Sequence, residues 1–168
     1  LDLVEHDGGY AAQFVSGDKD YLNVTAADGS SLLTGYDEIS ISYDLLVPNT
    51  SGTNWVYYIA PDDSSLSWDT NGNKERYLGV LIKNGNLEAE RYNNNGSRPT
   101  NPSAGITAGT WQHVDIVYAE DSTLVYVDGE LKAQADTSYQ LTDILGSESI
   151  FQIGKANWAP GEYGTMTL

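Results

Sequence analysis

One hairpin of the sequence carries aromatic and carboxylate side chains of the kind that contact sugars. The dipeptide Asn84-Gly85 separates two short runs in which apolar and polar residues alternate, and Asn-Gly is a strong two-residue turn signal. If the apolar residues that alternate with Tyr77 face a core, Tyr77 points the other way and shares its face with Glu90 and Tyr92. Aromatic rings cover the C–H faces of a sugar, and carboxylates accept hydrogen bonds from its hydroxyls. We therefore predict an exposed binding surface here, with an ordinary solvated sheet face as the alternative.

A cation and an amide continue the same run. Arg91 is one of only 8 basic residues, and a guanidinium pairs bidentately with a uronic or sialic carboxylate. The alternative is an ion pair with Glu88 or Glu90. Asn93 begins the following asparagine-rich segment and is predicted to belong to the binding surface.

Three further aromatic residues are candidates for stacking on a sugar. Trp55 and Tyr57 alternate along one strand pattern, which places both on one face. Trp158 lies in a Gly- and Pro-rich segment, where it either stacks on a ligand or plugs the end of a sandwich. By contrast, Trp111 and His113 open a strand with Val114 inward, so we expect the tryptophan to pack in the core and the histidine to make structural hydrogen bonds.

A possible cation site follows from oxygen ligands at alternate positions. Asp69, Asn71 and Asn73 have this spacing, and hard cations such as calcium prefer carboxylate and amide oxygens. The segment is not an EF-hand loop, because it lacks the glycine and glutamate of that motif. Alternative acidic candidates are Asp18 with Asp20, and Asp62 with Asp63.

Catalytic patterns are weak in this sequence. Glycoside hydrolysis requires two carboxylates in one cleft, and Glu88 and Glu90 approach this spacing without a third acid following them. Neither His6 nor His113 has a recognisable nucleophile motif nearby. We expect no enzymatic activity from this chain, with a hydrolase as a minor alternative.

Composition excludes several classes of protein. The 168 residues include 24 acidic and 8 basic side chains, a formal net charge of −16, so we expect neither nucleic acid nor an anionic membrane as partner. There is no cysteine, which removes disulfides and thiolate chemistry. A chain of this length is expected to form a single domain, residues 1–168, and no apolar run is long enough for membrane insertion.

The elements that position these residues are strands. Period-two runs bounded by Gly, Asn, Asp, Ser and Pro recur, and helical periodicity is hard to find. The expected strands are 39–47, 55–60, 76–82, 87–92, 112–119, 123–128, 130–135 and 150–154. This pattern predicts an all-β fold of two packed antiparallel sheets.

Several motifs together resemble a known group of proteins. They are Trp111-Gln-His-Val114, Tyr126-Val-Asp-Gly129 and Phe151-Gln-Ile-Gly154, with Gly9-Tyr-Ala-Ala-Gln-Phe14 upstream. In combination they are similar to laminin-G-like modules of the concanavalin A-like lectin and glucanase superfamily. The resemblance implies a jelly-roll β-sandwich, often with a structural calcium ion. Such modules usually end in a further strand pair, whereas this chain ends at Met166-Thr-Leu168.

The resemblance also implies a function. Modules of this type often bind carbohydrate beside the catalytic domain of a secreted bacterial glycoside hydrolase. We therefore expect a non-catalytic, monomeric, secreted or cell-surface module whose partners are a glycan and neighbouring domains. The alternative is an adhesion or protein-interaction module, or a domain that braces its neighbours.

Overall fold

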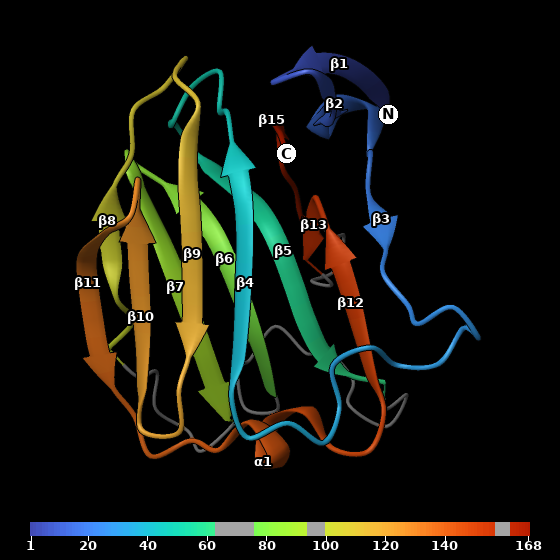
Figure 1. The fold of residues 1–168 in the computed structure, drawn as a ribbon, viewed down its shortest axis with the longest axis vertical. Coiled ribbons are helices and arrows are strands. Elements are labelled where there is room, and N and C mark those ends of the chain that lie inside the picture. Colours follow the sequence, from blue (N-terminus) through green and yellow to red (C-terminus); the bar gives the residue numbers. More distant parts are fainter. Residues whose placement is uncertain (63–75, 94–99, 157–161) are drawn as a thin grey trace.

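Two antiparallel sheets face each other in the computed structural model, which describes residues 1–62, 76–93, 100–156 and 162–168 (Figure 1). The four-stranded sheet has the order β11-β10-β9-β4. Its strands are β4 (Ile39–Leu45), β9 (Gln112–Tyr118), β10 (Ser122–Val127) and β11 (Glu130–Asp136). The prediction of an all-β, two-sheet sandwich is confirmed.

The larger sheet has six strands in the order β3-β12-β5-β6-β7-β8. They are β3 (Leu22–Asn23), β5 (Thr53–Pro61), β6 (Arg76–Lys83), β7 (Asn86–Asn93), β8 (Ser103–Gly105) and β12 (Ser149–Ile153). The β6–β7 hairpin turns at Asn84 (φ 51°) and Gly85 (φ 87°), and Asp128-Gly129 turns β10 into β11 with φ of 53° and 77°. Positive φ at both positions matches the twist of the flanking strands, so both predicted hairpins form.

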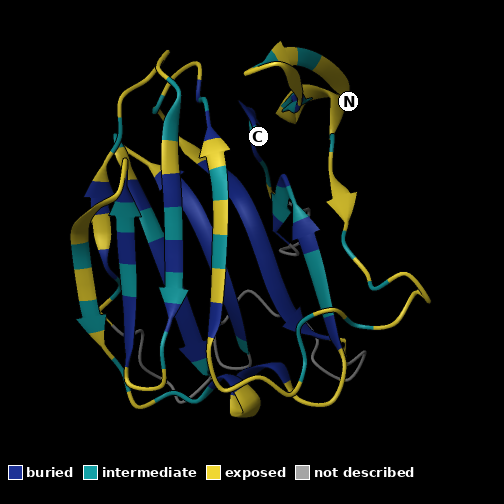
Figure 2. Cartoon of the chain, in the orientation of Figure 1, coloured by how far each residue is buried: buried dark blue, intermediate teal, exposed yellow. Residues whose placement is uncertain are grey.

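Alternation along the strands fills the space between the sheets. Every second residue of β6, β7, β9 and β10 is buried there, and the nearly continuous buried runs lie in β5, β6 and β7 of the six-stranded sheet (Figure 2). A five-residue helix, α1 (Leu141–Leu145), closes one end of this sandwich core. Leu141, Ile144 and Leu145 sit at helical spacing and are all buried. A single turn is too short to leave a clear periodic signal, so the sequence did not predict it.

The two ends of the chain meet at the opposite end of the sandwich (Figure 1). There a small sheet has the order β1-β2-β15, from β1 (Asp2–His6), β2 (Gly9–Phe14) and β15 (Met166–Thr167). Met166 pairs with Phe14, and Leu46 bridges to Thr167. The last residues therefore form a short strand that joins the N-terminal hairpin to the sandwich.

Three short elements complete the fold. A 3-10 turn, η1 (Ser16–Asp18), follows β2, and β13 (Lys155–Ala156) pairs with β14 (Glu162–Tyr163). Both β13 and β14 contact β5. Within the described residues, no helix has the length and apolar character to cross a membrane.

Candidate functional site

The predicted binding surface lies on the face of the six-stranded sheet that is turned away from the sandwich core, which we call the outer face. Tyr77 pairs with Tyr92 across β6 and β7, and Gly79 pairs with Glu90. Leu78 packs in the sandwich core. The prediction that Tyr77, Glu90 and Tyr92 share one face is therefore confirmed.

The expected exposure of this surface is wrong. Tyr77 is 0% exposed, Tyr92 3% and Glu90 8%, and the Tyr77 hydroxyl donates a 2.5 Å hydrogen bond to Glu90. These rings belong to a second apolar cluster, the outer-face cluster: Trp55, Tyr58, Ala60, Tyr77, Leu81, Tyr92 and Ala156. Alternation predicts which side of a sheet a residue occupies, but it does not predict what covers that side. None of these rings presents an open face to a sugar.

A bulge in β5 separates Trp55 from Tyr57, which the sequence placed together. Trp55 pairs with Leu81 and Tyr57 with Val80, so Val56 is an extra residue and the alternation slips by one. Trp55 joins the outer-face cluster, where its indole lies against Gly79. Tyr57 points into the sandwich core. The prediction that both lie on one exposed face is corrected.

The buried hydroxyl of Tyr57 has another tyrosine as its hydrogen-bond partner in the core. Its hydroxyl lies 3.1 Å from that of Tyr118 on β9. Burial raises the pKa of both phenols. Tyr57 thus links the two sheets and is not accessible to a ligand.

Arg91 also departs from both of its predicted roles. It pairs with Leu78, which directs its side chain inward, and it is 2% exposed. Its guanidinium donates to three backbone carbonyls of the β9–β10 connection: Ala119 at 2.6 Å, Ser122 at 3.3 Å and Glu120 at 3.4 Å. Burial lowers the pKa of Arg91. It therefore fixes a loop and faces neither a sugar carboxylate nor Glu90.

The remaining predicted residues divide between described and undescribed parts of the chain. Asn93 is half-buried at the end of β7, opposite Arg76. Trp158, Asp69, Asn71 and Asn73 lie outside the described residues.

The calcium ion that the resemblance implies stays a prediction. Within the described ranges, no three Asp, Glu or His side chains gather in a way that would hold a metal ion. The Asp20 carboxylate accepts a hydrogen bond from the Val15 N–H at 3.1 Å. Asp62 lines two adjoining polar hollows with Glu148, and the described lining residues include no third acid. A calcium site around Asp69 stays a prediction.

An accessible aromatic site, which the sequence did not predict, lies at the β3 side of the six-stranded sheet. We call Tyr21, Lys155 and Tyr163 the tyrosine–lysine group. The two rings are 6.3 Å apart at 59°, and the Lys155 ammonium lies 4.6 Å from the centre of the Tyr21 ring. Tyr21 is 41% exposed, and Tyr163 and Lys155 are half-buried. The group thus offers ring surface and a cation to solvent.

Backbone pairing explains how these distant residues meet. Lys155 pairs with Tyr163 in the β13–β14 ladder, so both point to one side, while Ala156 and Glu162 point to the other. Leu22, next to Tyr21, pairs with Ile153 of β12. No local pattern signals a contact across more than a hundred residues, which is why the sequence did not reveal it.

The outer-face cluster holds this ladder in place. The Trp55 indole N–H donates to the Glu162 carboxylate at 2.6 Å, and Ala156 packs in the cluster. Gly164 lies directly on the Trp55 backbone, where a Cβ would come within 2.3 Å of the carbonyl oxygen. The buried aromatic residues therefore support the accessible ones.

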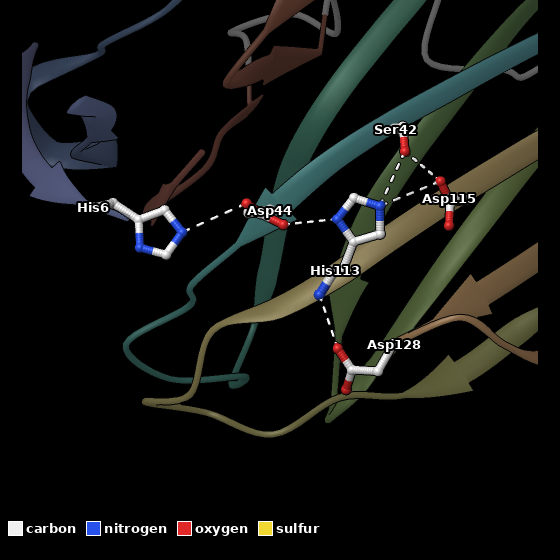
Figure 3. A network of polar contacts seen from close by, with 6 residues as sticks. All are labelled: His6, Ser42, Asp44, His113, Asp115 and Asp128. Atoms are coloured by element: carbon white, nitrogen blue, oxygen red, sulfur yellow. Dashed lines mark hydrogen bonds and ion pairs between the residues drawn. The ribbon is translucent and has the colours of Figure 1, made fainter. Parts of the chain in front are cut away.

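A second unpredicted feature is a histidine–aspartate network on the four-stranded sheet, comprising the six residues drawn in Figure 3. Asp44 bridges two imidazoles: His113 Nδ1 lies 2.7 Å from one carboxylate oxygen, and His6 Nε2 lies 3.5 Å from the other. The His6 ring stacks on Trp111 at 3.6 Å. The network thus fastens the N-terminal hairpin to the sandwich, and Trp111 is half-buried in this contact instead of in the core.

Hydrogen bonds set the protonation of this network. The hydrogen bond to Asp44, aided by the charge of Asp115, raises the pKa of His113. The hydrogen bond to His113 in turn lowers the pKa of Asp44. The structural role expected for His113 is confirmed.

Ser42, His113 and Asp44 have the order of a Ser-His-Asp triad. Ser42 Oγ lies 3.2 Å from His113 Nε2, but its hydroxyl also donates a short hydrogen bond to Asp115. His113 is about half exposed to water. Electrostatic stabilisation of a transition state is weaker at such a position than in a site that excludes water. The arrangement is better explained as a surface hydrogen-bond network.

The comparisons with known proteins agree with this fold. The chain belongs to the concanavalin A-like lectin/glucanase superfamily, because the laminin G-type model of that superfamily matches residues 33–166. No curated protein sequence is close enough to count as a relative.

Solved structures share the architecture at low sequence identity. One is the CBM40 of the Ruminococcus gnavus IT-sialidase bound to α2,3-sialyllactose, with 13% identity, TM-score 0.60, and coverage of 77% of this chain and 72% of that chain. Another is domain 4 of an extracellular GH43 arabinanase from Geobacillus stearothermophilus with arabinotriose, with 16% identity, TM-score 0.56, and coverage of 98% and 70%. Mouse laminin α1 domains LG4–5 match at 13% identity and TM-score 0.53, covering 82% of this chain and 36% of that fragment. At these identities the likeness establishes the fold alone.

Proposed function

We propose that this chain is a non-catalytic carbohydrate-binding module and that a sugar ring binds at the tyrosine–lysine group. The observation that carries the proposal is the pair of accessible rings, Tyr21 and Tyr163, with ring centres 6.3 Å apart and the Lys155 ammonium over both of them. Aromatic faces cover the apolar C–H patch of a sugar, while polar groups at their rim bond its hydroxyls. The ladder and the outer-face cluster hold this site ready before ligand arrives.

The fold neighbours support this choice of ligand. Two of the structures named above contain a bound oligosaccharide, sialyllactose in one and arabinotriose in the other. A shallow site with two rings gives affinity of order mM to μM, which tethering to an enzyme raises by effective concentration. The proposed setting is therefore a secreted or cell-surface protein, with this module beside a bacterial glycoside hydrolase domain.

An adhesion or bracing role is the second candidate, and the N-terminal hairpin favours it. Leu1, Leu3 and Tyr10 are exposed by 50%, 68% and 72%. Leu3 and Tyr10 lie near each other on the ladder, because Leu3 pairs with Ala12 and Glu5 pairs with Tyr10. An exposed apolar strand surface of this kind suits contact with another protein.

Binding to a glycan array, with and without EDTA, tests the function and the predicted calcium ion together. We expect binding to a restricted set of glycans, and Tyr163→Ala and Tyr21→Ala each to weaken it about tenfold, ~1.4 kcal/mol. Tyr10→Ala is the matched control, because it removes an exposed tyrosine from the distant hairpin and should leave affinity unchanged. Absence of binding to every sugar in calcium would leave the adhesion or bracing role.

A further inference from the structure

Lys155 is an unusual cation for this molecule. The chain has 24 acidic side chains and only 8 basic ones, so a lysine is expected to have a carboxylate nearby. Instead, its ammonium contacts two rings, 4.6 Å from the centre of Tyr21 and 6.0 Å from that of Tyr163. Within the described residues, no carboxylate forms an ion pair with it. Among the residues that the structure describes, its partners are thus aromatic rings and not carboxylates.

The acidic residues next to the two tyrosines of the group, Asp20 beside Tyr21 and Glu162 beside Tyr163, have other hydrogen-bond partners. The Asp20 carboxylate accepts a hydrogen bond from the Val15 N–H at 3.1 Å. The carboxylate of Glu162 lies across the ladder and accepts the indole N–H of Trp55. Within the described residues, neither of these two carboxylates forms an ion pair with Lys155.

Building on the proposed function, we infer that the site prefers sugars that carry a negative charge. A sugar that packs against Tyr21 or Tyr163 brings its substituents near the Lys155 ammonium, which lies 4.6 Å from one ring centre and 6.0 Å from the other. A carboxylate or sulfate there would accept a charge-assisted hydrogen bond, stronger than one to a neutral hydroxyl. Lysine serves as a compact point charge with rotatable donors, so it suits carboxylate and sulfate alike.

The acidic surface does not prevent this preference. The net charge of −16 is spread over the whole molecule, and at about 0.15 M salt the field of a surface charge is screened beyond about 8 Å. A direct contact with Lys155 lies within that distance. The local cation therefore governs recognition at physiological salt.

Matched sugar pairs test the inference by calorimetric titration. The carboxylate pair is 3′-sialyllactose with lactose, a second carboxylate pair is trigalacturonic acid with its carboxyl-reduced trimer, and the sulfate pair is 3′-sulfolactose with lactose. We expect at least one acidic member to bind about tenfold more tightly than its neutral partner. The pair that discriminates identifies the anion.

Two variants test whether a preference for the charged sugar depends on the Lys155 ammonium. Lys155→Gln should remove the discrimination between the charged and the neutral member of a pair, and Lys155→Arg should retain it. Thermal unfolding of both variants verifies that they fold like the parent.

The outcomes separate the two proposals. Equal affinity for charged and neutral members, or a preference that survives Lys155→Gln, overturns the inference while the glycan-binding function stands. Absence of binding to any of the sugars, and to the array, overturns the function itself.

Discussion

Aromatic residues in this protein divide into two groups with different roles. Tyr77 and Tyr92 are buried in the outer-face cluster, with ring centres 5.9 Å apart, whereas Tyr21 is accessible at the edge of the sheet. Burying a tyrosine stabilises the fold by removing apolar surface from water. An accessible ring keeps its apolar surface in water until a ligand covers it, so its burial can contribute to the free energy of binding. Stability and binding are thus expected to depend on different tyrosines.

Substituting a buried and an exposed tyrosine should therefore change the free energy of unfolding by very different amounts. Tyr92→Ala should destabilise the protein by about 3–5 kcal/mol, because it leaves a cavity among packed rings. Tyr10→Ala, at a position that is 72% exposed, should change stability by less than about 0.5 kcal/mol. Urea denaturation measures both. A stable Tyr92→Ala variant with impaired sugar binding would restore the exposed surface predicted from the sequence.

At the residue scale, the sequence predicted the face of the sheet on which a side chain lies better than it predicted the exposure of that side chain to solvent. Period-two alternation correctly placed Tyr77, Glu90 and Tyr92 together. It failed for Tyr57, because the extra residue of a bulge reverses the alternation and no local signal marks it. It also could not show that Arg91 finds carbonyl partners in a loop about thirty residues away. Burial and long-range partners are properties of the assembled fold.

Among the elements, the β13–β14 ladder depends on one close approach. Gly164→Ala would place a Cβ 2.3 Å from the Trp55 carbonyl oxygen, so the strand must move. We expect a loss of about 1–3 kcal/mol in stability together with weaker sugar binding, because Tyr163 moves with the ladder.

A glycine without such a neighbour provides the control. Nothing lies within 4 Å of a Cβ built on Gly105 in β8, so Gly105→Ala should leave both stability and binding near the parent values. If Gly164→Ala leaves sugar affinity intact, the ladder does not position the binding residues.

The histidine–aspartate network predicts a dependence on pH for the element that it fastens. Asp44 and Asp115 raise the pKa of His113, so its contribution to stability is full below the ordinary value of 6.5 and is lost as pH rises through the raised value. Asp44 has a lowered pKa, so its contribution is present above its ordinary value of 3.8 and is lost on acidification.

NMR titration of the imidazole protons between about pH 5 and about pH 8 measures this shift directly. We expect His113 to titrate above 6.5, Asp44→Asn to lower its pKa, and the free energy of unfolding to depend less on pH in His113→Gln. A pKa for His113 at or below the ordinary value would contradict the network.

For the molecule as a whole, the sequence predicted the class of fold and eight of its main strands. Repeated alternation and two turn dipeptides with the required positive φ carried that prediction. The sequence predicted neither the N-terminal hairpin, β1 and β2, nor the short strands, including β13, β14 and β15; a two-residue strand has no periodicity to detect. The short strands β13 and β14 carry Lys155 and Tyr163 of the accessible site, so the best candidate site arose where the sequence was least informative.

The central claim is that sugar binds at the tyrosine–lysine group. Amide chemical shifts of the ¹⁵N-labelled chain, followed during titration with a glycan that it binds, map the site without a substitution. The account predicts that the largest changes fall in residues 20–22, 153–156 and 162–164. Changes confined to the β1–β2 hairpin or to the four-stranded sheet would contradict it.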